Sequence, residues 1–169
     1  MTQSTAKYKN VILYLAKALG GSIKGKKKLA KLLYYVDFDR FEYKESMKSV
    51  TGDTYKAWKM GPVPIAYAGV IDELIKDNKL DHTREDRSTG YNPTDVYLAK
   101  AEPDMSLFDE DDINILDHVA KKYGGLNGTQ LQHLTHDEAP YIGTEPDSKI
   151  DYELAFYRET DFSDVLADT

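Results

Sequence analysis

The sequence predicts one α+β domain that is predominantly α-helical, a compact helical bundle of about five to six helices with a small antiparallel β element. Apolar residues recur at helical spacing in most of the 169-residue chain. Glycine or proline separates these segments, and short stretches near 55–60 and 79–100 have the turn-bounded pattern of strands. A chain of this length buries about 70% of its unfolded surface as a single domain. Because neither a linker nor a repeat divides the sequence, residues 1–169 are expected to form one domain.

The first two helices are expected at residues 5–19 and at about 26–43. Gly20 and Gly21 follow the first helix, and glycine readily adopts the left-handed geometry that ends a helix. The second helix has two apolar stripes, Leu29, Leu32, Leu33 and Val36 on one face and Tyr34, Phe38 and Phe41 on another. A helix that is apolar on two sides is usually surrounded by other elements. This helix is therefore expected at the centre of the domain.

The stretch Gly61-Pro62-Val63-Pro64 follows a short strand predicted at residues 55–60, and it is interpreted as a corner between this strand and a helix. Val63 precedes a proline and is therefore restricted to extended geometry. Pro64 has a fixed φ and lacks the N–H group that the first turn of a helix leaves unused. The next helix is therefore expected to begin near Pro64 and to end at about Lys76.

A β-hairpin and a long helix are expected next. Residues 79–100 contain two short strand-like segments around a polar, charged loop at 84–94, which predicts a hairpin with a charged tip. Residues 108–123 predict a helix, because this segment begins with acidic residues and ends with Lys121 and Lys122 before two glycines.

The rest of the chain is expected to contain two short elements and a tail. Residues 129–136 predict a short helix, and residues 150–159 predict a helix or a turn. The last residues, from about 159 to 169, are expected to form a tail.

The net charge of −7 conceals a strong asymmetry along the chain. Residues 1–60 contain 13 Lys or Arg and 5 Asp or Glu, whereas residues 101–169 contain 4 and 17. Segments of opposite sign either pair within the fold or present separate fields to a partner, and mixed surfaces, in which the signs are interspersed, are the norm. The acidic balance of the whole chain argues against general nucleic-acid binding.

Several functional classes have no support in the sequence. There is no cysteine, which excludes disulfides, thiolate nucleophiles and cysteine-ligated zinc. Residues 1–20 lack the features of a signal peptide, and no apolar run is long enough to span a membrane, so a cytoplasmic location is expected. No nucleotide-binding loop or nucleophile elbow is present. The chain is therefore expected to be no enzyme and to need no cofactor.

One cluster of metal-ligand residue types occurs in the chain. It consists of His133, His136, Asp137 and Glu138, and neighbours three apart on a helix can share a metal. A further ligand and the groups that orient the ligands would have to come from elsewhere. Hydrogen bonding at the end of the helix is the expected role, so no metal site is predicted.

A helix-turn-helix is an alternative interpretation of residues 108–136. The glycine-containing turn before residue 129 suits this motif, and the hairpin at 79–100 would be a wing. This interpretation predicts a DNA-binding transcriptional regulator. However, the helix at 129–136 has no Arg or Lys with which to contact phosphate or guanine, so nucleic acid is not the expected partner.

Three landmarks, in this order, resemble the Panacea domain of SocA-like antitoxins, a family that includes phage-associated GepA-type proteins. They are KLLYYVDFDRFEYKE, TGDTYKAWKMGPVPIAYAGVIDEL, and LTHDEAPYIGT followed by IDYELAFYRE. The resemblance extends from about residue 7 to 158. The family-motif residues are Gly61, Pro62, Val63, Pro64, His136, Glu138 and Pro140. Family members often have Trp where this chain has Tyr141, which preserves an aromatic ring but not an indole N–H.

The resemblance implies an antitoxin of a bacterial or prophage toxin–antitoxin system. Such a protein neutralises its cognate toxin by direct binding, or it delivers the toxin to a cytosolic AAA+ protease. The expected partner is therefore a protein toxin, joined by a protease of this kind if the chain acts as an adaptor, and no membrane is expected.

The candidate partner-binding residues are Trp58, Met60, Pro62, Tyr67 and Tyr141, together with Lys26, Lys27 and Lys28. Aromatic side chains are typical anchors of protein interfaces, and the lysines would steer the chain toward an acidic partner. Because Trp58 and Met60 share one face of the predicted strand, they are expected to be buried together or exposed together. Packing in the core is the alternative for both.

Overall fold

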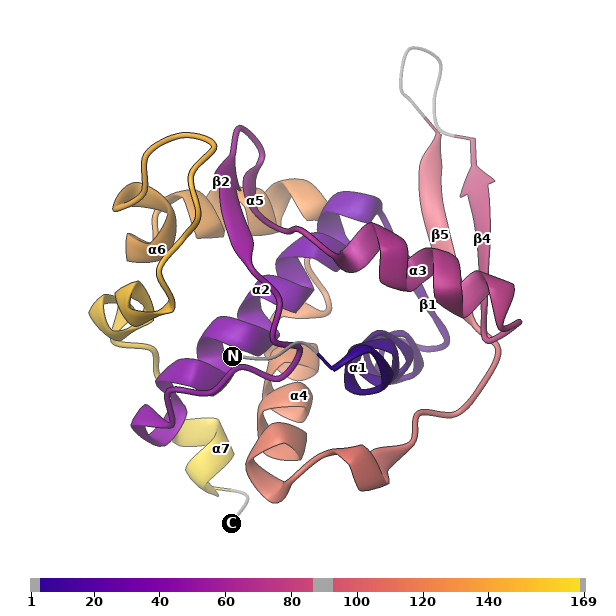
Figure 1. Ribbon diagram of the computed structural model, residues 1–169, viewed down its shortest axis with the longest axis horizontal. Helices are drawn as coiled ribbons and strands as arrows, with labels where there is room; N and C mark the ends of the chain where they lie inside the picture. Colours follow the sequence, from indigo (N-terminus) through magenta and orange to yellow (C-terminus); the bar gives the residue numbers. More distant parts are fainter. Residues whose placement is uncertain (1–3, 87–92, 168–169) are drawn as a thin grey trace.

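The computed structural model describes residues 4–86 and 93–167, and in this part of the chain helices and two small antiparallel sheets surround a central helix (Figure 1). The α-helices are α1 (Thr5–Ala18), α2 (Lys26–Glu42), α3 (Tyr67–Lys76), α4 (Glu110–Tyr123), α5 (Gly128–His136), α6 (Ala139–Ile142) and α7 (Ser163–Ala167). The strands are β1 (Ser22–Lys24), β2 (Tyr55–Trp58), β3 (Gly61–Pro64), β4 (Leu80–Glu85) and β5 (Thr94–Ala99). Three 3-10 helices are η1 (Tyr43–Glu45), η2 (Met105–Leu107) and η3 (Tyr152–Arg158).

The predicted α+β class is confirmed, but the number of helices exceeds the predicted five to six. The additional α-helices, α6 and α7, have four and five residues. Segments this short do not complete two turns, so they leave no helical periodicity in the sequence. Within the described residues, no helix combines the length and the apolarity needed to cross a bilayer.

Helix α2 lies at the centre of the domain, as predicted. Thirteen of its 17 residues are buried, which requires neighbours on every side. Figure 1 shows α2 crossing the middle of the molecule, where α4, α5, β3 and η3 pack against it. Its buried residues include four polar or charged side chains, Lys31, Asp37, Asp39 and Arg40.

Tyrosine side chains fill much of the space around α2 and direct their hydroxyl groups to buried carboxylates. Tyr55 donates to Asp37 Oδ2 over 2.6 Å, and Tyr8 donates to Asp53 Oδ2 over 2.6 Å. Burial is the main cause that raises the pKa of both tyrosines above the usual range. The hydroxyls therefore remain protonated donors, and the high tyrosine content serves the core.

The stretch Gly61–Pro64 is a strand, so its interpretation as a strand-to-helix corner is wrong. It forms β3, which pairs antiparallel with β2 through the register Tyr55↔Pro64, Lys56↔Val63, Ala57↔Pro62 and Trp58↔Gly61. The predicted strand at 55–60 is correct only as far as Trp58, because Lys59 and Met60 form the turn. Helix α3 begins at Tyr67, not near Pro64.

Two prolines fit in β3 because they occupy positions that make no hydrogen bond to β2. The residues opposite them, Tyr55 and Ala57, direct their backbone groups away from β3. The Ala57 N–H donates to the Ser148 carbonyl over 3.0 Å, and the Ile150 N–H donates to the Tyr55 carbonyl over 2.8 Å. In an antiparallel pair such positions alternate, so prolines two residues apart remove no bond from the ladder.

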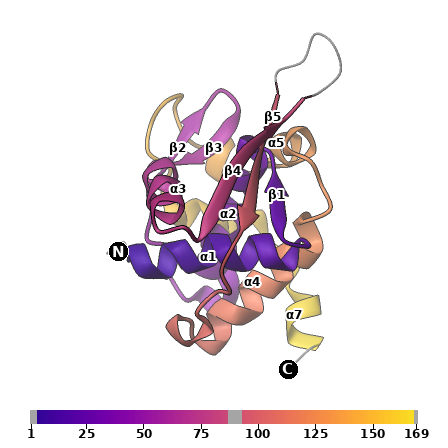
Figure 2. The same ribbon diagram turned by 90° about the vertical axis from the view of Figure 1, so that its right-hand side faces the viewer.

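The second sheet has the strand order β1-β5-β4 (Figure 2). The predicted hairpin at 79–100 is confirmed as β4 and β5, whereas β1 was not predicted. Part of the predicted charged tip, residues 87–92, lies outside the described residues. Strand β1 has three residues, between Gly20-Gly21 and Gly25, and is too short for a strand pattern in the sequence.

The segment predicted as a C-terminal tail includes α7, which packs against α4. Val165 is buried, and Asp164 lies 2.7 Å from Nδ1 of His118, a buried residue of α4. Burial lowers the pKa of His118, but the neighbouring carboxylates of Asp39 and Asp164 outweigh it and raise the pKa overall. Asp164 thus gives a buried imidazole a partner, and this contact helps to hold α7 on the domain.

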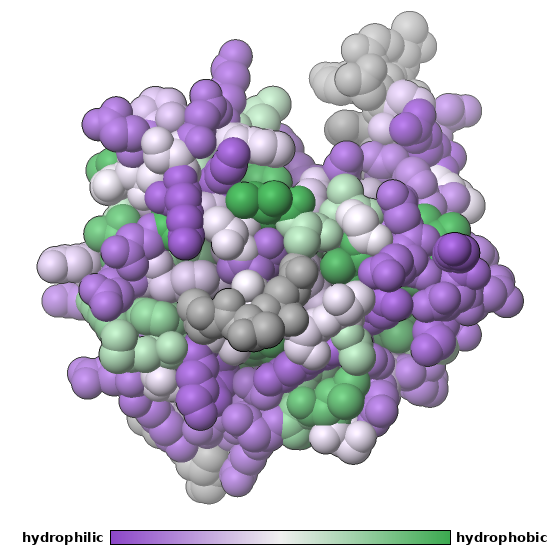
Figure 3. Space-filling view, viewed as in Figure 1, coloured by the Kyte–Doolittle hydropathy of each residue, from purple (hydrophilic) through white to green (hydrophobic). Residues whose placement is uncertain are grey.

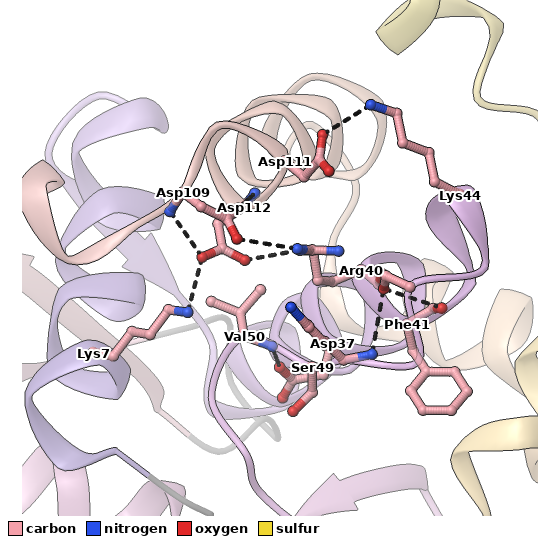
Figure 4. Close-up of polar contacts among 12 residues, drawn as sticks. Lys7, Asp37, Arg40, Phe41, Lys44, Ser49, Val50, Asp109, Asp111 and Asp112 are labelled. Carbon is pink, nitrogen blue, oxygen red and sulfur yellow. Dashed lines mark hydrogen bonds and ion pairs between the residues drawn. The ribbon is translucent and has the colours of Figure 1, made fainter. Parts of the chain in front are cut away.

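Part of the charge asymmetry is neutralised by pairing within the fold. Lysines and an arginine from the first 60 residues contact carboxylates of the last third. The pairs are Lys7–Asp112 at 2.8 Å, Arg40–Asp112 at 2.8 Å, Lys44–Asp111 at 3.1 Å and Lys17–Glu102 at 3.0 Å (Figure 4 shows the first three). The basic N-terminal part and the acidic C-terminal part are therefore complementary surfaces of one domain.

Arg158 connects η3 to α2 and to the segment before α6. Its side chain is 4% exposed, and Nη2 lies 2.7 Å from both Asp39 and Glu42. Nη1 lies 3.2 Å from Glu138. Burial by itself lowers the pKa of Arg158, but these carboxylates raise it well above its usual value. The guanidinium is therefore the cation that several partly or fully buried carboxylates share.

Replacing Arg158 should destabilise the domain severely. Arg158→Met leaves buried carboxylates without a cation, so the free energy of unfolding is expected to fall by about 3–5 kcal/mol. Arg84→Met is the matched control, because Arg84 is 69% exposed and pairs only with Asp95 among the described residues, and its loss should cost less than about 1 kcal/mol. Urea unfolding of both variants measures the difference, and similar losses would contradict the role assigned to Arg158.

Candidate functional site

The tip of the β2–β3 hairpin carries two large apolar side chains into solvent. Trp58 is 44% exposed and Met60 is 52% exposed. Tyr55 and Ala57 are buried on the opposite face of β2. The expectation that Trp58 and Met60 share one environment is thus met, and the alternative of core packing is wrong for both. A hollow separates this hairpin from the β4–β5 hairpin at the upper edge of the molecule (Figure 3). The name hairpin tip is used below for Trp58, Lys59 and Met60.

The hairpin is held in place by hydrogen bonds to its backbone. The Tyr141 hydroxyl donates to the Trp58 carbonyl over 2.7 Å, and Lys31 Nζ donates to the Pro62 carbonyl over 2.9 Å. The ring of Tyr141 stacks on His136 with a centroid distance of 4.4 Å. Tyr141 thus supplies a hydroxyl donor to the strand and an aromatic face to α5, so no indole N–H is needed at this position.

Gly61 permits the close approach of the hairpin to α2 and α5. Its φ of 109° lies in the region that favours glycine. A Cβ at this position would lie 2.8 Å from Lys31 Cε and 3.0 Å from Thr135 Oγ1. The family-motif glycine is therefore required both by its backbone conformation and by lack of space.

Beneath the hairpin lies a buried lysine beside a histidine. Lys31 is 1% exposed, and burial, with a smaller effect of the like charge of Lys27, lowers its pKa to about 7. Burial and then the charge of Lys31 lower the pKa of His136. His136 Nε2 is buried and has no hydrogen-bond partner among the described residues. The underside of the hairpin is thus a desolvated region where positive charge is disfavoured.

The three candidate lysines do not form one free cationic patch. Lys27 donates to Gln132 Oε1 over 2.7 Å, and Lys28 donates to the Gly124 carbonyl over 2.6 Å. Both are half-buried, and they tie the start of α2 to α5 and to the end of α4. Lys26 is exposed, with Nζ 6.0 Å from the centroid of the Tyr67 ring. Of the three, Lys26 is the one available to a partner.

Other candidate residues lie inside the domain. Pro62 is buried, and so are the motif residues Val63, Pro64 and Pro140. Tyr67 is 9% exposed, beneath Lys26. A buried ring can support a surface but offers little area to a partner.

The motif carboxylate Glu138 has a structural role. It accepts hydrogen bonds from the hydroxyls of Tyr34 and Tyr35 over 2.7 and 2.8 Å and also contacts Arg158. Its carboxylate therefore faces α2 and η3. In the described part of the chain, no three His, Cys, Asp or Glu residues converge as metal ligands, so the cluster from His133 to Glu138 is not assembled as a metal site.

The arrangement of α4 and α5 differs from a helix-turn-helix. The two helices pack against α2 rather than extensively against each other. The exposed residues of α5 are Thr129, Gln130, His133 and Leu134, which include no Lys or Arg. This face offers no cation to nucleic acid.

Lys31 and Arg158 were not predicted as residues that support the site. A weak signal for each exists in the sequence. Lys31 lies between the two apolar stripes of the expected central helix, where a solvated lysine would be out of place. Arg158 is one of only four Lys or Arg in residues 101–169, so several carboxylates compete for it. The residues that contact Lys31 and Arg158 come from distant parts of the chain, so no local sequence pattern indicates them.

Comparison with protein families gives one match. The model of the family described as "Antitoxin SocA-like, Panacea domain" matches residues 29–141, about two thirds of the chain. The matched range includes α2, the β2–β3 hairpin and the motif from His136 to Tyr141. Comparison with curated proteins and with solved structures finds no match.

Substitution of Gly61 should loosen the hairpin. In Gly61→Ala the added Cβ meets the buried end of Lys31 and forces an unfavourable φ, so the free energy of unfolding should fall by about 1–3 kcal/mol. Gly69→Ala is the control, because a Cβ at this α3 glycine would meet no atom within 4 Å beyond its chain neighbours and the adjacent backbone of its own helix, and it should stabilise by roughly 0.5–1 kcal/mol. Denaturant unfolding of the wild type and both variants measures these changes. If Gly61→Ala had the same unfolding midpoint as the wild type, the close approach of the hairpin to α2 and α5 would be contradicted.

Lys31 should make stability depend on pH above neutrality. The pKa of Lys31 is about 7 in the folded protein and near 10.5 when unfolded. Between these values the unfolded chain binds more protons, so raising the pH stabilises the fold. Relative to Lys31→Met, the wild type should gain up to about 1.4 kcal/mol per pH unit over this range.

The test is urea unfolding of both proteins at about pH 7, 8 and 9. Lys76→Met, at an exposed lysine of α3, is the control and should retain the pH dependence of the wild type. Parallel pH profiles for the wild type and Lys31→Met would show that Lys31 is not a buried group of depressed pKa.

Proposed function

The chain belongs to the family of SocA-like antitoxins with a Panacea domain, and on this basis we propose that it neutralises a cognate protein toxin by binding it directly. We place the contact at the hairpin tip, with Tyr141 as its support. The chain acts here as a binding module and makes or breaks no bond.

The observation that carries this proposal is the exposure of Trp58 on a rigid support. Tryptophan is among the residues most often found at the energetic centre of protein interfaces. The hydrogen bonds from Tyr141 and Lys31 fix the hairpin backbone before any partner arrives. A preformed contact loses little conformational entropy on binding, so the exposed area of Trp58 and Met60 can contribute to affinity.

Charge around the tip favours an acidic surface on the toxin. Lys59 is exposed in the turn, and Lys56 lies on the same face of β2 as Trp58. Neither lysine has an ion pair within the described residues. Unpaired cations at the rim of a contact mainly accelerate association with an acidic partner.

Direct binding differs from delivery to a protease in its outcome for the toxin. Occlusion gives a stable antitoxin–toxin complex in which the amount of toxin is unchanged. A proteolytic adaptor lowers the amount of toxin instead. In that case binding alone does not neutralise the toxin, and a protease is also required. We propose occlusion, because a preformed tip is sufficient for it.

Co-expression with the product of the adjacent gene tests this proposal. The neighbour alone should arrest growth, and co-expression of the wild-type chain should restore it with the toxin level maintained. Trp58→Ala should weaken the purified complex by about 30-fold, which corresponds to about 2 kcal/mol, and should impair rescue. Its folding should be unaffected, because the bond from Tyr141 goes to the backbone of Trp58.

Leu98→Ala is the matched control, since Leu98 is 46% exposed on β5, in the other sheet. It should rescue growth like the wild type. A harmless neighbour, or the absence of a complex, would refute direct neutralisation. A complex that tolerates Trp58→Ala would instead refute the hairpin tip as the contact.

A further inference from the structure

We propose a second docking surface, a groove between α6 and η3 that binds an extended segment of a partner protein in which an aliphatic residue lies next to Lys or Arg. The name α6–η3 groove is used for the surface lined by Asp137, Ala139, Ile142, Gly143, Leu154 and Tyr157. This surface goes beyond the proposed function, because it shares no residue with the hairpin tip and has the opposite charge.

The groove contains the most exposed large apolar side chains of the described residues. Tyr157 is 78% exposed and Ile142 is 66% exposed. Single apolar residues on a surface are ordinary, but these two face one depression of about 470 Å³, with Leu154 in its wall. The depression is open to solvent, and an aliphatic side chain seated in it can contact the apolar atoms of Ile142, Leu154 and Tyr157.

The walls of the groove are fixed by buried contacts. Glu138, which immediately precedes α6, is held by Tyr34, Tyr35 and Arg158. Arg158 immediately follows Tyr157 and is bound to Asp39 of α2. A groove held in this way exists before its partner binds, which limits the entropy lost on binding.

Gly143 lies where the two walls of the groove meet. A Cβ at this residue would lie 3.0 Å from the Ala139 carbonyl oxygen and 3.4 Å from Leu154 Cδ1. A side chain at this residue would therefore crowd the backbone of α6, whereas Leu154 of η3 would be at ordinary contact distance in the wall of the groove.

A polar pocket of about 370 Å³ adjoins the groove and shares Asp137, Ala139 and Tyr157 with it. Glu159, Asp161 and Lys122 also line this pocket. Asp161 accepts a hydrogen bond from the Ser163 N–H, which is the main cause that lowers its pKa and keeps it ionised.

The net charge of this pocket is negative. Glu138 and Arg158, which also line it, contact each other and their charges cancel. The remaining Asp137, Glu159 and Asp161 outnumber Lys122. A cationic side chain is therefore the group that this pocket attracts, and the exposed Tyr157 ring beside it can add a cation–π contact.

These two features define one occupant. Because the groove and the pocket share Tyr157, an aliphatic side chain and a cation one or two residues away would fill both, since an extended chain advances about 3.3–3.6 Å per residue. An acidic segment is repelled, and a nucleic acid is excluded for the same reason. The basic hairpin tip selects for the opposite charge, so the two surfaces discriminate between different segments.

The experiment is an NMR titration of the isotope-labelled full chain with the acetylated, amidated peptide Gly-Ser-Leu-Arg-Gly-Ser. Saturable shifts are expected in residues 137–143 and 154–161. Two control peptides replace Arg by Gln or Leu by Ser, and each should bind at least about fivefold more weakly, because each loses one of the two contacts. Together the two control peptides test whether binding requires both the apolar residue and the cation.

Protein variants test the location. The double variant Ile142→Ser, Tyr157→Ser should abolish the shifts while its spectrum retains the dispersion of a folded protein. Leu107→Ser is the matched control at a 38% exposed leucine of η2 and should bind like the wild type. Trp58→Ala should also leave peptide binding unchanged, which separates this surface from the one proposed for the toxin.

Three results would overturn the proposal. The first is shifts that do not saturate or that spread equally to the acidic first turn of α4, Glu110 to Asp112. The second is equal binding of the control peptides. The third is binding that survives the Ile142→Ser, Tyr157→Ser substitutions. The two proposals can fail separately. If the chain does not neutralise the toxin, peptide binding in the α6–η3 groove can still be observed, and if the peptide does not bind, toxin neutralisation through the hairpin tip is unaffected.

Discussion

The burial of α2 on all sides is the constraint on which the rest of the structure depends. A buried polar group without a partner costs free energy, so each polar residue of this helix requires a particular neighbour. Lys31 is matched by the Pro62 carbonyl of β3, and Asp37 accepts hydrogen bonds from the segment that leads into β2. Asp39 and Arg40 receive their counter-charges from η3 and α4. The neighbours of α2 are thus positioned by directional contacts as well as by apolar packing.

The same constraint makes the surface rigid where a partner would bind. The β2–β3 hairpin has little sheet of its own, and a two-stranded hairpin is marginal in water. Its support comes from Lys31, from Tyr141 and from residues 147–150, which pair with the outer edge of β2. Lys31 is a costly support, because burial lowers its pKa to about 7. An exposed Trp58 on this support is consistent with the proposed contact to a toxin, and the chain belongs to a family of antitoxins.

Local rules predicted most helices but failed at the β2–β3 hairpin. The spacing of apolar residues located α1, α2 and α5 within one or two residues, and the two stripes on the second helix placed it at the centre. The fixed φ and the missing N–H of proline were interpreted as signs of a helix start at Pro64. Prolines two residues apart are equally compatible with a strand whose N–H positions on that side form no hydrogen bond to a neighbouring strand. Which rule applies depends on residues 147–150, about 85 positions away, since these take the hydrogen bonds of Tyr55 and Ala57. The site was predicted in the same uneven way: Trp58, Met60 and Lys26 are exposed, whereas Pro62 and Tyr67 are buried.

By itself the sequence determined the α+β class, the main helices, the central place of residues 26–43 and the family to which the chain belongs. These properties follow from periodicity, turn residues and short motifs, all of which are local. The tertiary structure decided which candidate side chains reach solvent, that Gly61–Pro64 pairs as a strand, and where the charges of the two ends meet. Such properties depend on contacts between distant positions: Arg158 binds Asp39 across 119 residues, and no local pattern records that pairing. The α6–η3 groove is a property of the same kind, because Ile142 and Tyr157 share a surface in a fold where Arg158 joins η3 to α2.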